Sequence, residues 1–154
     1  MSKSQVICIG EALIDRLITK NELNFKNYMG GAPANVACAL QKLKVSTAFI
    51  GCLGNDDNGN AFIKLFRKLN VNIDLLQISK EASTRVIKVV RDKSGERSFA
   101  GFENLTRDNF ADEILDKFEL ENRINYLNKL FLDNKYIITG SNILASKKSE
   151  ESLN

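Results

Sequence analysis

The stretch Gly30-Gly31-Ala32-Pro33-Ala34-Asn35-Val36-Ala37 marks the start of a predicted helix. Proline suits the first helical turn, because its φ is already helical and the N–H that it lacks has no partner there. Apolar residues then recur at helical spacing as far as Leu43, which predicts a helix that ends near Lys44. Small residues on its other side would let the helix pack closely against a sheet.

The two glycines before this helix suit a binding site as well as a turn. Without Cβ atoms they let backbone N–H groups approach a ligand, and a helix N-terminus favours oxygen-rich groups. Asn35, one turn into the helix, offers a donor and an acceptor that suit a hydroxyl group. The alternative is a tight strand-to-helix turn in which Asn35 bonds the local backbone. The pattern alone leaves both open.

The segments on either side predict an α/β fold with a mainly parallel sheet. Short apolar runs at 6–9, 47–54 and 136–140 are typical of buried strands, and helical patterns separate them. A further strand is expected at about 72–78, and residues 83–91 and 97–102 flank a polar turn, which predicts a β-hairpin. Four other segments complete the expected order: short strands or loop at 16–29, a helix from 56 or 57, helical structure at 108–132 with a break near Glu121, and the first turns of a helix at 146–154.

Composition narrows the class of protein. The chain has 154 residues, 44% hydrophobic and 27% charged, which fits one globular domain. A net charge of +3, evenly scattered, does not favour nucleic acid as a partner. The absence of histidine excludes Ser-His-Asp triads, Cys-His dyads and His-ligated zinc sites. Three dispersed cysteines without a CxxC pair, and no apolar run long enough to cross a membrane, predict a cytoplasmic protein with inert thiols.

Asp15 is the strongest candidate for a ligand-binding carboxylate. It follows the first predicted strand, and open α/β sheets bind ligands at the carboxyl ends of their strands. An Asp there can accept two hydroxyl hydrogen bonds, as a sugar diol requires, whereas an isolated loop carboxylate would simply be solvated. Glu11 has the same two interpretations. The phosphate-loop patterns GxxxxGK[ST] and GxGxxG are absent, which disfavours a dinucleotide site.

The hairpin carries charge and aromatic groups whose role the sequence leaves open. Its basic residues could face an anion, although such residues usually form the solvated face of a ribbon; they are Arg85, Lys88, Arg91, Lys93 and Arg97. Phe99 and Phe102 could form the hairpin core or cover a ligand as part of a lid.

Four blocks in order resemble the N-terminal half of the ribokinase/PfkB family of carbohydrate kinases, within it most closely the bacterial and plant fructokinases. The blocks are GEALID at 10–15, GGAPANVA at 30–37, GCLGND at 51–56 with Gly59, and GERSFAGF at 95–102. The resemblance implies that residues 1–154 form the N-terminal part of one three-layer α/β/α kinase domain, with lid segments at about 16–29 and 72–102. The family usually has Gly where Lys44 stands, so a left-handed helix cap is expected there, weaker by about 1 kcal/mol.

The resemblance also implies the site. Asp15, Gly31 and Asn35 would hydrogen-bond sugar hydroxyls, Gly30 would shape the turn, Phe102 would come from the lid and Ser141 would border the pocket. Fructose is the expected sugar, and a homodimer through the lid is possible in this family. ATP and Mg²⁺ are the cofactors of the complete enzyme.

The family's Gly-Ala-Gly-Asp element, which holds the catalytic base, has no counterpart in this sequence. We therefore expect a fragment that binds sugar, lacks catalytic, ATP-binding and metal-binding residues, and exposes the apolar faces that a second half would cover. The alternatives are a non-catalytic sugar-binding or interaction module and a nucleoside kinase of the same family.

Overall fold

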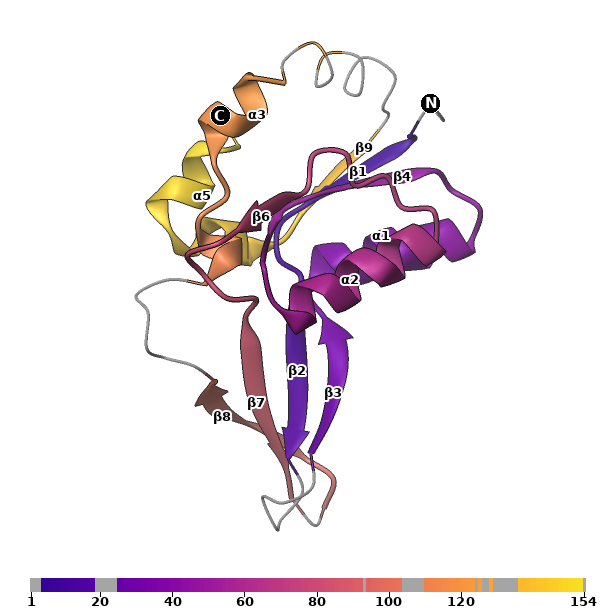
Figure 1. Cartoon of the computed structure of the whole chain (residues 1–154). Coiled ribbons are helices and arrows are strands. Elements are labelled where there is room, and N and C mark those ends of the chain that lie inside the picture. Colours follow the sequence, from indigo (N-terminus) through magenta and orange to yellow (C-terminus); the bar gives the residue numbers. More distant parts are fainter. Residues whose placement is uncertain are drawn as a thin grey trace.

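A three-stranded parallel sheet forms the centre of the molecule (Figure 1). The computed structural model describes residues 4–18, 25–92, 94–103, 110–123 and 136–153, with Asn125 and Asn128. In the sheet, β1 (Val6–Ile9) lies between β4 (Thr47–Ile50) and β9 (Tyr136–Thr139). All residues of β1 and β4 are buried, as their continuous apolar runs predict.

Helices cover both faces of this sheet. On one side lie α1 (Ala32–Lys42) and α2 (Asp57–Lys68), where Phe49 of β4 packs against Phe66 with ring centroids 4.8 Å apart. Asp56 caps α2 by accepting the Gly59 N–H at 2.8 Å. On the other side lie η1 (Ala111–Glu113), α3 (Lys117–Glu121), η2 (Ser141–Ala145) and α5 (Lys147–Glu151). Alternate residues of β1 enter the two cores, so the predicted three-layer arrangement is present.

A second sheet projects away from these layers (Figure 1). Its strands are β2 (Leu13–Ile18), β3 (Phe25–Gly30), β7 (Val86–Arg91) and β8 (Arg97–Phe102), in the order β3-β2-β7-β8. We call it the lid sheet. The predicted hairpin is confirmed as β7 and β8. The predicted segment 16–29 contains the end of β2 and most of β3, while 19–24 and residue 93 lie outside the described residues.

Two predicted strands differ from those in the structure. The strand expected over 47–54 is interrupted at Gly51, where a Cβ would lie 2.5 Å from the Gly10 carbonyl oxygen. After the interruption, β5 (Cys52–Gly54) pairs with β6 (Gln77–Ser79), so the strand expected at 72–78 contributes only its end. It is broken because the Asn72 side chain accepts the Asp74 N–H at 2.9 Å, which bends the chain.

In the segment 108–132, the described part contains η1, α3 and the helical residues Asn125 and Asn128. Turn residues 122 and 123 follow α3, which agrees with the predicted break near Glu121; 108–109, 124, 126–127 and 129–132 lie outside the described part.

Strand β9 is not buried as predicted. Tyr136 and Ile137 are 65% and 56% exposed, because β9 is an edge strand with β1 as its one partner among the described strands. This exposed apolar surface agrees with the expectation of uncovered faces. The helix expected after Ser146 is confirmed as α5, capped by the Ser146 hydroxyl. No helix within the described ranges is long and apolar enough to cross a bilayer.

Helices α1 and α2 end in the same type of cap. After α1, Lys44 has φ of 61°, its N–H bonds the Gln41 carbonyl, and the Val45 N–H bonds the Leu40 carbonyl. After α2, Asn70 takes the equivalent place with φ of 60°. These are Schellman caps, which favour glycine at the left-handed position. The expected left-handed conformation at Lys44 is therefore present.

We predict that Lys44→Gly stabilises the protein by about 1 kcal/mol, because the left-handed backbone strains a residue with a Cβ. Asn70→Gly is the matched control and should change stability less, because asparagine tolerates this conformation better. Chemical denaturation of the two variants measures the difference. A destabilised Lys44→Gly variant would contradict the prediction.

Candidate functional site

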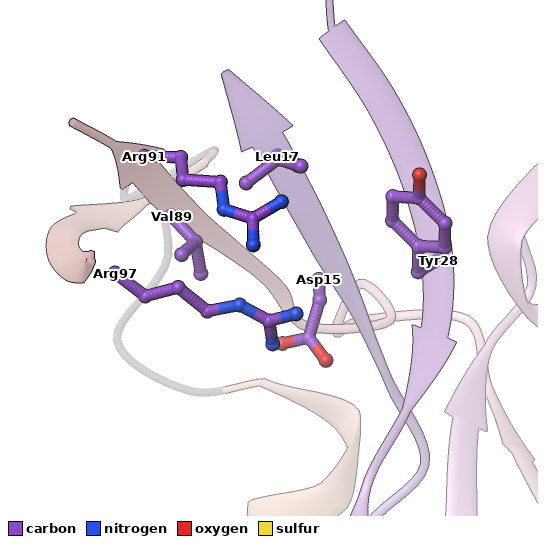
Figure 2. Close-up of a pocket in the computed structure, with 6 residues that line it drawn as sticks. All are labelled: Asp15, Leu17, Tyr28, Val89, Arg91 and Arg97. Carbon is purple, nitrogen blue, oxygen red and sulfur yellow. The ribbon is translucent and has the colours of Figure 1, made fainter. Parts of the chain in front are cut away.

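One face of the lid sheet carries a pocket of about 410 Å³ (Figure 2). Asp15 on β2 lies opposite Tyr28 on β3, and two residues further along Leu17 lies opposite Val89 on β7. Opposed residues and alternate residues share a face of a sheet, so the pairing brings these side chains together. The lining is completed by Arg91 and Arg97.

Gly30 and Gly31 join the lid sheet to helix α1 with no room for side chains. A Cβ at Gly30 would collide with Oδ2 of Asp15. Gly31 is the N-cap of α1 with φ of 94°, and a Cβ there would lie 2.5 Å from the Glu11 carbonyl oxygen. The turn therefore brings the start of α1 directly beside the Asp15 carboxylate.

Asn35 and Ser141 lie near the start of α1 and are not among the residues that line the pocket. Asn35 is exposed, and its side chain makes no hydrogen bond to any residue that the structure describes. Ser141 is exposed and follows Gly140, where a Cβ would lie 2.9 Å from Cγ of Pro33. Asp15 thus lies in the pocket, whereas Asn35 and Ser141 lie at the helix start, and the two glycines connect these two places.

Glu11 supports this helix start from inside. It is 5% exposed, and its Oε1 accepts the Ala32 N–H at 3.1 Å. Such an acceptor satisfies one of the donors that a helix leaves free at its N-terminus. The interpretation of Glu11 as a solvated loop carboxylate is therefore wrong: Glu11 is a buried cap of α1.

Phe102 lies at the foot of the lid sheet, outside the pocket lining. Its ring is 5.3 Å from that of Phe110, and the Arg85 guanidinium lies over both rings, 5.5 Å and 4.8 Å from their centroids. Arg85 is itself buried and paired with two carboxylates, at 3.0 Å from Asp112 and 2.7 Å from Glu113. The interpretation of Arg85 as part of a solvated face is therefore wrong. Its partners lie 27 and 28 residues away, so no local pattern indicates them.

The other basic residues of the hairpin divide between the two faces. Arg91 and Arg97 line the pocket, so they face a possible ligand, whereas Lys88 lies opposite Arg16 on the other face. Lys93 lies outside the described residues. No local sequence pattern links these arginines to Asp15, because the register of four strands decides which face they share.

Charge and burial in the pocket act on Asp15 in opposite directions. Partial burial raises the pKa of Asp15 above its ordinary value, since it disfavours the charged form, and the positive charge of Arg97 partly offsets this rise. The ionised carboxylate can accept hydrogen bonds from hydroxyl groups on both oxygens, whereas protonation turns one oxygen into a donor and removes part of this capacity.

Nucleophilic and metal chemistry find little support here. Burial raises the pKa of Cys8 to about 11 and that of Cys52 to about 12, so both thiols stay protonated near neutral pH. Within the described ranges no three acidic or cysteine side chains cluster as metal ligands would. The arrangement is suited to binding a small polar ligand.

The chain is similar to known carbohydrate kinases. The model of the pfkB family of carbohydrate kinases matches residues 3–148. A probable chloroplastic fructokinase of Arabidopsis thaliana is 37% identical over 75% of this chain and 31% of its own length. An aminoimidazole riboside kinase of Salmonella typhimurium is 33% identical over 62% of this chain and 30% of its own. The crystal structure of a Xylella fastidiosa fructokinase with bound ATP superposes with a TM-score of 0.79, at 30% identity over 96% of this chain and 42% of that one. The chain spans less than half of each.

We predict that Gly31→Ala is more destabilising than Gly101→Ala, by about 1 kcal/mol or more. Both glycines have positive φ, 94° and 103°, so both substitutions strain the backbone. A Cβ at Gly101 meets nothing within 4 Å, whereas one at Gly31 would lie against Glu11 and Ala12. Denaturation of the two variants isolates the cost of crowding. Equal losses of stability would show that the turn has room for a side chain.

Proposed function

The chain belongs to the pfkB family of carbohydrate kinases, and on that premise we propose that it holds the sugar-binding part of a fructokinase-like enzyme, which phosphorylates a sugar hydroxyl with ATP. The observation that carries the proposal is the Asp15 carboxylate, unbonded to any described residue, in a pocket beside the start of α1. A volume of about 410 Å³ is in the range of small-molecule sites.

In the proposed complex each residue has a defined task. Asp15 accepts hydrogen bonds from two neighbouring hydroxyls of fructose, while the backbone at Gly31 and the amide of Asn35 bind further hydroxyls. Gly30 keeps the start of α1 close to Asp15. Phe102, at the foot of the lid sheet, and Ser141, which follows Gly140 beside Pro33, are the further residues that we expect to border the bound sugar. Together these groups bind and orient the sugar.

We assign no catalytic residue to this chain. ATP and Mg²⁺ would serve the complete enzyme, and the Xylella relative was solved with ATP bound. We propose that no residue of this chain binds these cofactors, since the described residues form no acidic cluster and the sequence contains neither phosphate-loop pattern. Phosphoryl transfer depends on such groups to position and neutralise the phosphates. No step of the transfer is therefore attributed to residues of this chain.

Two alternatives have an observation in their favour. A nucleoside kinase is supported by the Salmonella riboside kinase among the relatives. A sugar-binding or interaction module without catalysis is supported by the second face of the lid sheet, where Phe25 and Met29 are 52% and 37% exposed. That face would also serve the possible homodimer. A cytoplasmic location stays a prediction, since the Arabidopsis relative is chloroplastic.

We predict that Asp15→Asn weakens binding of D-fructose about 10-fold or more, because hydrogen bonds to a charged acceptor contribute about 1.5–3 kcal/mol. Isothermal titration calorimetry of the 154-residue chain measures the affinity. Asp57→Asn, at the exposed start of α2, is the control and should bind like the unaltered chain. Ribose and adenosine, titrated in parallel, separate the fructokinase from the nucleoside kinase.

An Asp15→Asn variant that binds fructose as tightly as the unaltered chain would contradict the proposal, as would an unaltered chain that binds none of these ligands. An ATP-consumption assay with fructose completes the experiment. Turnover by this chain alone would contradict the assignment of no catalytic residue.

A further inference from the structure

Arg97 reaches toward Asp15 from a strand that is not its neighbour. Asp15 lies opposite Ile87 near the foot of β7, while Arg97 on β8 lies opposite Arg91 at the far end of that strand. Figure 2 shows the Arg97 side chain extending past Val89 with its guanidinium group directed toward the Asp15 carboxylate. The Arg97 side chain on β8 thus crosses β7 and places its positive charge in the pocket.

The two pocket arginines differ in their other contacts. The Nε of Arg91 donates to the Gly95 carbonyl at 2.9 Å, which ties this side chain to the hairpin turn. The Arg97 side chain has no hydrogen bond or ion pair to the residues that the structure describes. Its charge is therefore directed at the pocket.

The groups around Asp15 leave Arg97 as its main electrostatic partner. Tyr28 lies opposite Asp15 on β3, and Lys26 lies on the same face two residues further along. Arg91 on β7 and Arg97 on β8 line the same pocket. Of these, Arg97 is the group whose charge lowers the pKa of Asp15, against the rise that burial causes. An anionic carboxylate with a cation nearby keeps its charge to lower pH.

We propose that Arg97 is a positioning residue of the pocket: its guanidinium group, directed toward Asp15, favours the charged carboxylate that accepts the sugar hydroxyls. This inference rests on the proposed function, in which that carboxylate accepts two hydroxyl protons. When Asp15 is protonated it loses part of this capacity. Without Arg97, the pKa of Asp15 rises further, so sugar binding is lost at a higher pH as the solution is acidified. Far above that pH the loss of Arg97 has little effect.

The first experiment follows Asp15 itself. The carboxyl carbon of Asp15 is titrated by NMR between about pH 3 and pH 8 in the unaltered chain, Arg97→Gln, Arg97→Lys and Lys88→Gln. Lys88 is a matched control, since it lies on the next strand but on the opposite face. We expect a higher pKa in Arg97→Gln, a value near the original in Arg97→Lys, and no change in Lys88→Gln. An unchanged pKa in Arg97→Gln, or an equal rise in Lys88→Gln, would overturn the proposal.

The second experiment measures D-fructose affinity over the same pH range. Arg97→Gln should lose binding at a higher pH than the unaltered chain and bind nearly as tightly at the alkaline end. A loss of affinity that is equal at every pH would overturn the positioning role, since it would indicate a direct contact or a structural defect. Absence of fructose binding by the unaltered chain would contradict the proposed function, and the Asp15 titration alone would then decide whether Arg97 controls its charge.

Discussion

The turn from β3 into α1 is the constraint on which the site depends. At Gly31 the backbone has positive φ and passes so close to Glu11 that no side chain fits, and at Gly30 a side chain would collide with Asp15. Because of this close approach, the helix start and the lid carboxylate adjoin each other although they belong to different layers. The buried Glu11 side chain stabilises the same turn by accepting the Ala32 N–H. A binding site formed by the start of α1 and the Asp15 carboxylate therefore depends on the close turn at the two glycines and on the Glu11 cap.

Much of the fold was predictable because its signals are local. The buried strands β1 and β4, the proline at the start of α1, the Asp56 cap and the β7–β8 hairpin all follow from short stretches of sequence. The predictions of secondary structure and burial failed where contacts beyond the local sequence pattern determine the structure. The sequence of β9 reads as a buried strand, but β9 lies at the edge of the sheet. Asn72 ends an expected strand through a side-chain hydrogen bond that competes with the sheet.

The site shows the same difference between features with a local sequence signal and features that depend on strand pairing. Asp15 was identifiable from its place after a strand, and the glycines from their place before a helix. Which hairpin residues share a face was not identifiable from the sequence. The reason is that β8 contains one extra residue relative to β7 between the pairs Ile87–Phe102 and Val89–Phe99. This bulge, at which Gly101 has φ of 103°, puts two aromatic residues three positions apart on the same face. Strict alternation would have assigned them to opposite faces.

The foot of the lid sheet is where the sheet that carries Asp15 is attached to the body of the protein, which carries Asn35. Arg85 immediately precedes β7, and its guanidinium group is held by Asp112 and Glu113 of η1, which packs against the central sheet. A buried cation held by two carboxylates has few alternative positions, because breaking one pair leaves a charge without its partner. Phe102, at the end of β8, stacks on the same group. The hairpin is thereby attached at its foot to the body of the protein. Since Asp15 stands beside β7 and Asn35 stands on the body, this attachment fixes the separation across which a single sugar would bind.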